Sequence, residues 1–249
     1  MEHQYPYFFG GSIWRVNITV TAMSLLTCII VAVFAVLATR NLDMRKPRGL
    51  QNMIEWVYDF VSKQAGQMME SADVARFLPL GLTLITYLFV ANWLGLMGNV
   101  IVDYKTGVPA LWITGGSQVS FFMSPTANIF AALGLSGMVI LLTHYLGLKQ
   151  PGHYFGHLVH PHWAMLPLNL IEEFAKWLTL GMRLFGNIFA GEVLIYAAMK
   201  IPSLFHIPID VIPLFVWLAY SGFVSTIQAF IFTLLTFAYI NQKLFREAH

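Results

Sequence analysis

The sequence contains little charge and a single cysteine. Of its 249 residues, 10% are charged and 57% are hydrophobic, whereas about a quarter of the residues in a soluble domain are charged. The lone cysteine, Cys28, excludes an internal disulfide framework. The net charge of +2 is too small and too dispersed for a nucleic-acid-binding surface. These absences exclude soluble and disulfide-rich proteins and favour a membrane protein.

The sequence also lacks the motifs of several enzyme classes. It contains no GxxxxGK phosphate-binding loop, so we expect this chain to bind no nucleotide and no cofactor. It offers no convincing set of nucleophile, base and orienting residue. No internal repeat is visible, which weighs against a transporter built from inverted repeats. We therefore expect no enzymatic activity of the chain by itself.

Histidine is the one residue type that suggests a metal site. The loop at 150–163 contains four histidines, namely His153, His157, His160 and His162. No cysteine or acidic residue accompanies them, and the loop is rich in glycine and proline. Zinc sites use a closer set of ligands on ordered elements, so we expect no metal site in this loop.

Long apolar runs predict an all-α, polytopic membrane protein that forms a single membrane domain over 1–249. About five runs are long enough to span a bilayer. We place the spans at residues 13–39, 77–101, 125–147, 165–200 and 209–243. The last two exceed the thickness of a bilayer, so they should be tilted or project from it. Ser124 and Pro125 predict the N-cap and first-turn proline of the third span.

The basic residues indicate how the chain is oriented. Four of them follow the first span within nine residues, at Arg40, Arg45, Lys46 and Arg48. The positive-inside rule places that loop in the cytoplasm, which puts the N-terminus outside and the C-terminus in the cytoplasm. In residues 50–69, apolar side chains recur close to the 3.6-residue period of a helix, and polar side chains lie between them. They predict an amphipathic helix that lies on the cytoplasmic face or packs on a partner.

The fourth predicted span carries charges that lipid disfavours. With a rotation of about 100° per residue, one face of this helix presents Glu172, Lys176, Arg183 and Asn187. Glu172 and Lys176 are spaced i,i+4 in the favourable order and can form an ion pair. They are more readily explained as a structural pair near the cytoplasmic mouth than as part of a transport route.

Two further carboxylates bracket Arg183 along the same helix. Glu173 lies toward the cytoplasmic side and Glu192 toward the outside. An unpaired arginine within lipid costs from roughly 3 to more than 10 kcal/mol, so its presence is a functional hypothesis by default. Two simpler explanations stay open: a buried ion pair that fixes Arg183, and a helix-end role for Glu192.

Proton transfer to a moving partner is the chemistry that this pattern suits. A carboxylic acid must be neutral to face lipid, and it releases its proton beside a permanent cation. Arginine cannot lose its own proton, so Arg183 would also block a direct leak. Glu192 and Glu173 would then serve two half-channels. On the last predicted helix, Gln228 could orient Arg183 or a water molecule.

Two stretches give the sequence a resemblance to a known family. Residues 182–192 read MRLFGNIFAGE, and residues 228–236 read QAFIFTLLT. Both resemble signature segments of the a subunit of F-type ATP synthases. The likeness extends to residues 40–60, to Asn92-Trp-Leu-Gly and to Ser124-Pro-Thr-Ala-Asn, and so covers most of the chain.

The resemblance implies a stator subunit in the plasma membrane of a bacterium. It would hold a rotating ring of c subunits against Arg183, while b subunits of the peripheral stalk grip the amphipathic helix and first span. By position, Arg183 matches the essential arginine, Glu192 the outer carboxylate, Gln228 the glutamine and Glu173 an inner acid. The last two helices would lie strongly tilted beside the ring.

One position departs from the pattern of the family. Some members have a histidine seven residues before the glutamine, where this chain has Ser221. The route near Glu192 would then depend on water or on Asp210. Asp210 lies in the first turn of its predicted helix, where a carboxylate also stabilises the helix dipole.

Two rival functions belong to other classes. A stand-alone proton-coupled carrier or channel would use Arg183 to bind an anionic substrate and would transport it without other subunits. A structural membrane scaffold would retain full function after Arg183→Ala.

Overall fold

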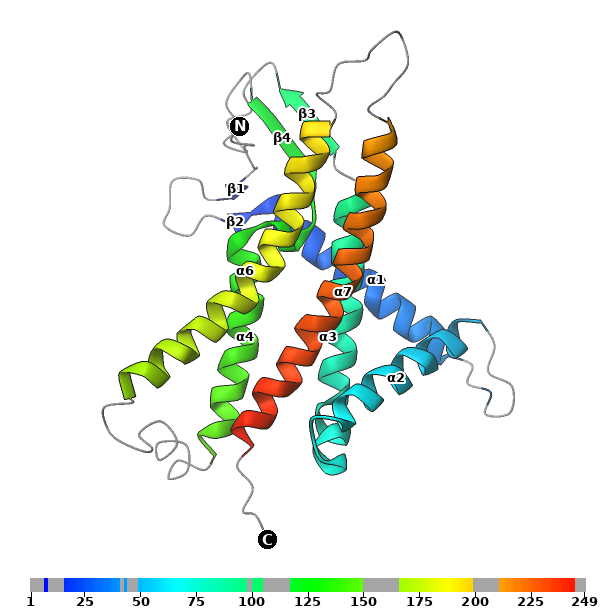
Figure 1. Ribbon diagram of the computed structural model, residues 1–249. Helices are drawn as coiled ribbons and strands as arrows, with labels where there is room; N and C mark the ends of the chain where they lie inside the picture. The colour runs from blue at the N-terminus through cyan, green and yellow to red at the C-terminus, as the bar shows by residue number, and fades with distance from the viewer. Residues whose placement is uncertain are drawn as a thin grey trace. The chain divides into compact units, whose positions relative to one another are not determined.

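The computed structural model describes residues 7–8, 16–40, 43, 49–97, 100–104, 117–149, 166–198 and 211–244, and helices dominate them. The helices are α1 (Ile18–Thr39), α2 (Leu50–Gly66), α3 (Ser71–Met97), α4 (Ile129–Gly147), α6 (Leu166–Ala198) and α7 (Val211–Lys243) (Figure 1). Within the described residues, α1, α3, α4 and α7 are long and apolar enough to cross a membrane. The prediction of an all-α polytopic membrane fold is confirmed.

Two short antiparallel strand pairs accompany the helices, and the sequence patterns did not predict them. Strand β1 (Tyr7–Phe8) pairs with β2 (Val16–Asn17). Strand β3 (Val100–Tyr104) pairs with β4 (Ser117–Phe122), with a register shift after Val100. The β-branched run at the start of β3 favours an extended chain. It follows the end of α3 at Met97.

The start of α4 differs from the prediction. Ser124 makes no side-chain cap bond, and Pro125–Ala127 form a separate 3-10 turn. Asn128 caps α4 instead, because its Oδ1 accepts hydrogen bonds from the backbone N–H groups of Phe130 at 2.9 Å and Ala131 at 3.3 Å. Asparagine is among the best N-cap residues. Ser124 is fully buried and donates to the Ala91 carbonyl at 3.1 Å.

The chain divides into two compact units. The first unit comprises Met1–Phe34, Tyr87–Ala131 and Phe185–Ile227, and the second comprises Ala35–Thr86, Ala132–Leu184 and Gln228–His249. In the first unit, Met123, Ala127 and Ile188 form a small buried cluster. Each of the helices α1, α3, α4, α6 and α7 contributes residues to both units.

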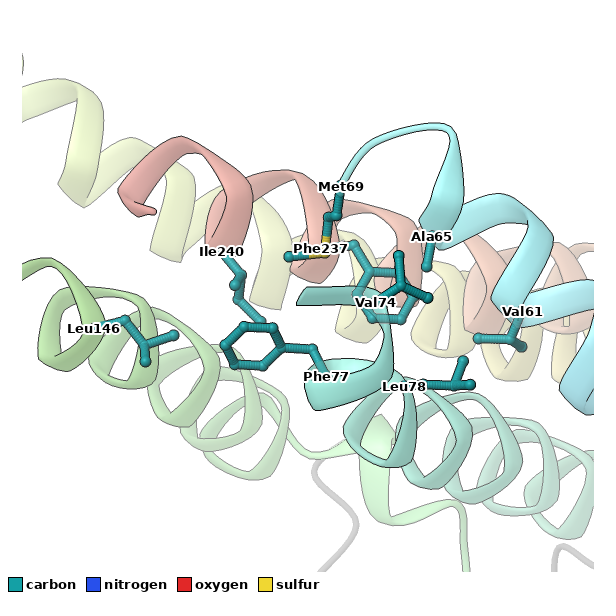
Figure 2. Packing of buried hydrophobic residues seen from close by; sticks show 9 residues of the cluster. All are labelled: Val61, Ala65, Met69, Val74, Phe77, Leu78, Leu146, Phe237 and Ile240. Atoms are coloured by element: carbon teal, nitrogen blue, oxygen red, sulfur yellow. The ribbon is translucent and has the colours of Figure 1, made fainter. Parts of the chain in front are cut away.

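The core of the second unit joins α2, α3, α4 and α7. Figure 2 shows its nine buried side chains, which are Val61, Ala65, Met69, Val74, Phe77, Leu78, Leu146, Phe237 and Ile240. The amphipathic pattern of α2 accounts for its share, because Val61 and Ala65 lie one turn apart on the buried face. The opposite face exposes Met53 and Trp56.

The loop before α2 is tied to that helix by one glutamine. The side-chain amide of Gln51 accepts from the backbone N–H of Asp43 at 3.0 Å and donates to the carbonyl of Asp43 at 3.1 Å. It also donates to Glu55 at 2.7 Å. Gly49, the residue before α2, has a φ of 60°, a backbone conformation that glycine adopts without strain.

Close packing of α3 on α7 yields a prediction for Gly81. A Cβ atom at Gly81 would overlap the ring of Phe237, which is fully buried and cannot move aside, whereas a Cβ at Gly134 of α4 meets open space. We expect Gly81→Ala to lower the free energy of unfolding by about 1–3 kcal/mol. Gly134→Ala should be neutral or slightly stabilising, because alanine favours a helix over glycine. Thermal unfolding of the purified chain in detergent checks this, and equal stability of the two variants would contradict it.

Candidate functional site

Arg183 lies in α6, a continuous helix of 33 residues. The residue is exposed. Among the described residues of its own unit, none forms an ion pair or hydrogen bond with its guanidinium group. The explanation that Arg183 is locked to an internal acid therefore has no support within the second unit.

The helix turn before Arg183 packs closely on α4. The indole Nε1 of Trp177 donates to the Leu133 carbonyl at 3.0 Å. A Cβ at Gly181 would approach Leu133 and Ser136 to 2.7 Å, so this glycine permits the close contact. The contact between α6 and α4 therefore reaches Gly181, two residues before Arg183.

A cluster of charges occupies the N-terminal part of α6. Lys176 Nζ lies 2.9 Å from Glu172 Oε1, which confirms the predicted i,i+4 pair. It also lies 3.3 Å from Glu173 Oε1. Glu172 is 62% exposed and Glu173 11% exposed, so the second carboxylate depends far more on its protein partners.

Glu173 has two partners that the sequence patterns missed. Lys243 of α7 donates to Glu173 Oε1 at 2.7 Å, and its side chain is only 5% exposed. His144 of α4 lies 3.8 Å from Glu173 Oε2. Lys176 reaches the same end of α7, where it donates to Gln242 Oε1 at 3.3 Å. The sequence did contain a signal for Lys243, because consecutive antiparallel helices bring the end of α7 and the start of α6 to the same side of a membrane.

A groove of about 1000 Å³ lies between α4 and α6 in the second unit. Most of its lining is apolar, from residues such as Leu141, Ile171 and Phe174. Of its lining residues, only His144 and Glu173 are titratable. Glu173 therefore borders an open space on one side and a lysine on the other.

Three of the predicted site residues hold polar atoms without a partner. The Nδ2 atom of Asn187, the Oγ atom of Ser221 and the Nε2 atom of Gln228 are buried and have no hydrogen-bond partner among the described residues. Buried polar groups are nearly always satisfied by protein or by water. These three positions are therefore suited to water or to groups of another subunit.

In the first unit, α6 and α7 meet at the residue before Glu192. Trp217 Nε1 donates to the Gly191 carbonyl at 3.1 Å. A Cβ at Gly191 would lie 3.6 Å from Ser221 Oγ. The backbone of Glu192 belongs to α6, but its side chain lies outside the described residues, as do Asp210 and the four loop histidines. Among the residues that the structure describes, no three or more His, Cys, Asp or Glu side chains cluster in a way that could hold a metal ion.

A buried polar network holds α7 in the first unit. Asn92, which is fully buried, donates to the Ser225 carbonyl of α7 at 3.3 Å and accepts from Thr126 Oγ1 at 2.9 Å. Thr126 Oγ1 in turn lies 2.7 Å from Ser124 Oγ. Asn92 of α3 therefore bonds between helices. It fixes α7 one turn from Ser221.

Comparisons with known proteins identify the family. The family model described as ATP synthase A chain matches residues 21–241. The chain belongs to the ATP synthase A chain family. It is 43% identical to ATP synthase subunit a of Anoxybacillus flavithermus over 98% of both chains. It is also 43% identical to the subunit a of Listeria monocytogenes, over 99% of this chain and 100% of that one. The subunit a of Bacillus pumilus is 42% identical over 93% of each chain.

Membership of the ATP synthase A chain family confirms the resemblance read from residues 182–192 and 228–236. The matched region includes α6 and nearly all of α7. Together with the apolar helices, the bacterial relatives identify the chain as a multi-pass membrane protein.

The network around Asn92 generates a stability prediction. Asn92→Leu keeps the volume but removes the hydrogen bond to the buried Ser225 carbonyl and the one from Thr126 Oγ1. We expect a loss of about 1–3 kcal/mol in the free energy of unfolding. Asn52→Leu, at an exposed position of α2, is the control and should change stability far less. Detergent-induced unfolding of the purified variants measures both, and equal midpoints would show that the network contributes no stability.

Proposed function

We propose that this chain is the proton-conducting stator subunit of a rotary ATP synthase. It would work in the membrane sector of that complex and carry no nucleotide site of its own. The observation that carries the proposal is Arg183, an exposed cation on a helix of the ATP synthase A chain family with no partner among the described residues of its unit. Such a charge within a membrane protein requires a functional partner.

The partner of Arg183 is a carboxylate on each subunit of a c ring. A ring carboxylate crosses lipid as the neutral acid. When it reaches Arg183, the guanidinium group stabilises the ionised form, and the proton leaves. Arg183 keeps its own proton, so no proton passes directly from one side to the other. Each charge that crosses the membrane supplies about 2.3 kcal/mol per 100 mV, and this drives rotation.

Two offset half-channels bring protons to the ring and remove them. Glu192 serves the outer half-channel, and Glu173 serves the inner one. The unpartnered buried atoms of Asn187, Ser221 and Gln228 support this proposal, because water held at these atoms can relay protons. Asp210 is a second acid for the outer mouth. Glu172 and Lys176 form a structural pair at the inner mouth.

The other proposed partners follow from the exposed surfaces. b subunits of the peripheral stalk cover α1 and the exposed face of α2, where Met53 and Trp56 lie. We place the chain in a bacterial plasma membrane, with the N-terminus outside and the C-terminus in the cytoplasm. The bacterial relatives and the basic residues after the first span support this placement.

The central prediction concerns Arg183→Lys. Lysine can lose its proton in a buried site, so the barrier to direct proton passage should fail. We expect proton-driven ATP synthesis to fall by about tenfold or more, since a difference of one pKa unit already changes a proton affinity about tenfold. Assembly of the complex should be normal. ATP synthesis by vesicles that contain the variant complex measures the effect. Arg76→Lys, at an exposed position of α3, is the matched control, and equal rates for both variants would refute the role of Arg183.

A second prediction concerns Glu192→Gln. The amide cannot exchange a proton, so proton flux through the complex should slow severalfold while assembly is unchanged. Acid-pulse fluorescence quenching in vesicles reports the flux. Asp59→Asn, an acid-to-amide change at an exposed position of α2, should leave the flux unaltered. Unchanged flux in Glu192→Gln would remove this residue from the proton route.

A further inference from the structure

Two adjacent residues of α7 join the N-terminal part of α6 in the second unit. Lys243 Nζ donates to Glu173 Oε1 at 2.7 Å, and Gln242 Oε1 accepts from Lys176 Nζ at 3.3 Å. The helix α7 thus supplies the donor in one bond and the acceptor in the other. We call Glu173, Lys176, Gln242 and Lys243 the α6–α7 clasp.

Within the clasp, the Lys243–Glu173 pair is buried to a degree that separates it from an ordinary surface ion pair. Lys243 is 5% exposed and Glu173 is 11% exposed. Exposed pairs contribute little to stability or geometry. When one member of a buried pair is removed, the other charge remains buried and uncompensated, so buried pairs constrain their helices strongly. Lys243 is therefore not a solvated lysine at a helix end.

Among the residues that the structure describes, the charged and titratable groups that face Glu173 belong to three helices. Lys176 of α6 lies 3.3 Å from it, Lys243 of α7 lies 2.7 Å away, and His144 of α4 lies 3.8 Å away. Glu172 pairs with Lys176 on the exposed side. The two lysines contact the same oxygen, Oε1, while Oε2 points to His144. The carboxylate is thus held through Oε1 by both lysines.

The clasp lies close enough to Arg183 to set its position. Glu173 and Arg183 are ten residues apart, which is about 15 Å along an α-helix. A slip of α6 past α7 by one turn would displace Arg183 by about 5.4 Å. Displacements of about 1 Å are enough to impair proton transfer between positioned groups.

We propose that Lys243 is a positioning residue for the proton route. It holds the Glu173 carboxylate in place and fixes the register of the Arg183-bearing helix against the helix that bears Gln228. Lys243 itself carries no proton along the route. This inference rests on the proposed function of the chain as the proton-conducting subunit.

A double-mutant cycle on the assembled ATP synthase tests the proposal. Lys243→Met, Glu173→Gln and the double variant are compared with wild type in vesicles, and proton-driven ATP synthesis is normalised to the amount of this chain in the complex. We expect each single variant to lose roughly threefold to tenfold in rate, and the double variant to lose no more than either, because contacting pairs are not additive. Lys149→Met, at an exposed position two residues after the end of α4, should match wild type.

A conservative variant separates positioning from a general loss of stability. Lys243→Arg keeps the charge and the donors, so it should retain most of the synthesis rate. If Lys243→Met reduces assembly, the cycle is run with Lys243→Gln, which keeps a donor and should give a smaller loss of the same kind. Rates equal to those of Lys149→Met, losses that add in the double variant, or an equal loss in Lys243→Arg would each overturn the proposal.

The same vesicles distinguish failure of this inference from failure of the proposed function. If Arg183→Lys abolishes synthesis while Lys243→Met behaves like Lys149→Met, the proton-conducting role stands and the positioning role is wrong. If Arg183→Lys synthesises ATP like wild type, the proposed function itself is wrong.

Discussion

A charge placed in a membrane helix needs a compensating group, and α6 meets this requirement unevenly. Near its N-terminus, Glu172 and Glu173 are neutralised by Lys176 and Lys243 at 2.7–3.3 Å. Arg183 has no such group among the described residues of its unit. This difference in charge compensation suggests that the N-terminal cluster and Arg183 have different tasks. The charge cluster fixes the helix, whereas the exposed guanidinium group of Arg183 fits the role toward another molecule that we propose for it.

The arrangement of small residues explains how one helix can do both. Gly181 lets α6 pack closely on α4 beside Leu133, and Gly191 accepts a hydrogen bond on its carbonyl from Trp217 of α7. Gly186 lies between these two glycines in the sequence, and a Cβ there would meet no other atom within 4 Å. Close contacts hold α6 within each unit, whereas the surface at Gly186 has no close neighbour among the described residues. Small residues are what membrane helices use to approach one another.

Local patterns in the sequence predicted the helices and the i,i+4 pair, because hydropathy and helical spacing depend on near neighbours. They failed where the decisive contact is distant. Asn128 rather than Ser124 caps α4, since the buried Ser124 bonds to Ala91. Strands β3 and β4 pair residues across a long loop. The partners of Glu173 come from α4 and α7, far along the chain. Spacing within α6 shows which groups need partners, and only the tertiary structure shows which partners they find.

The sequence separation within the clasp has a consequence for biosynthesis. Lys243 follows Glu173 by 70 residues, which a ribosome at 5–20 residues per second adds in roughly 4–14 s. During that interval Lys176 is the lysine of the clasp that is already present beside Glu173. The local pair thus neutralises the acid while the nascent chain enters the bilayer, and Lys243 adds a second, shorter contact once α7 has been made.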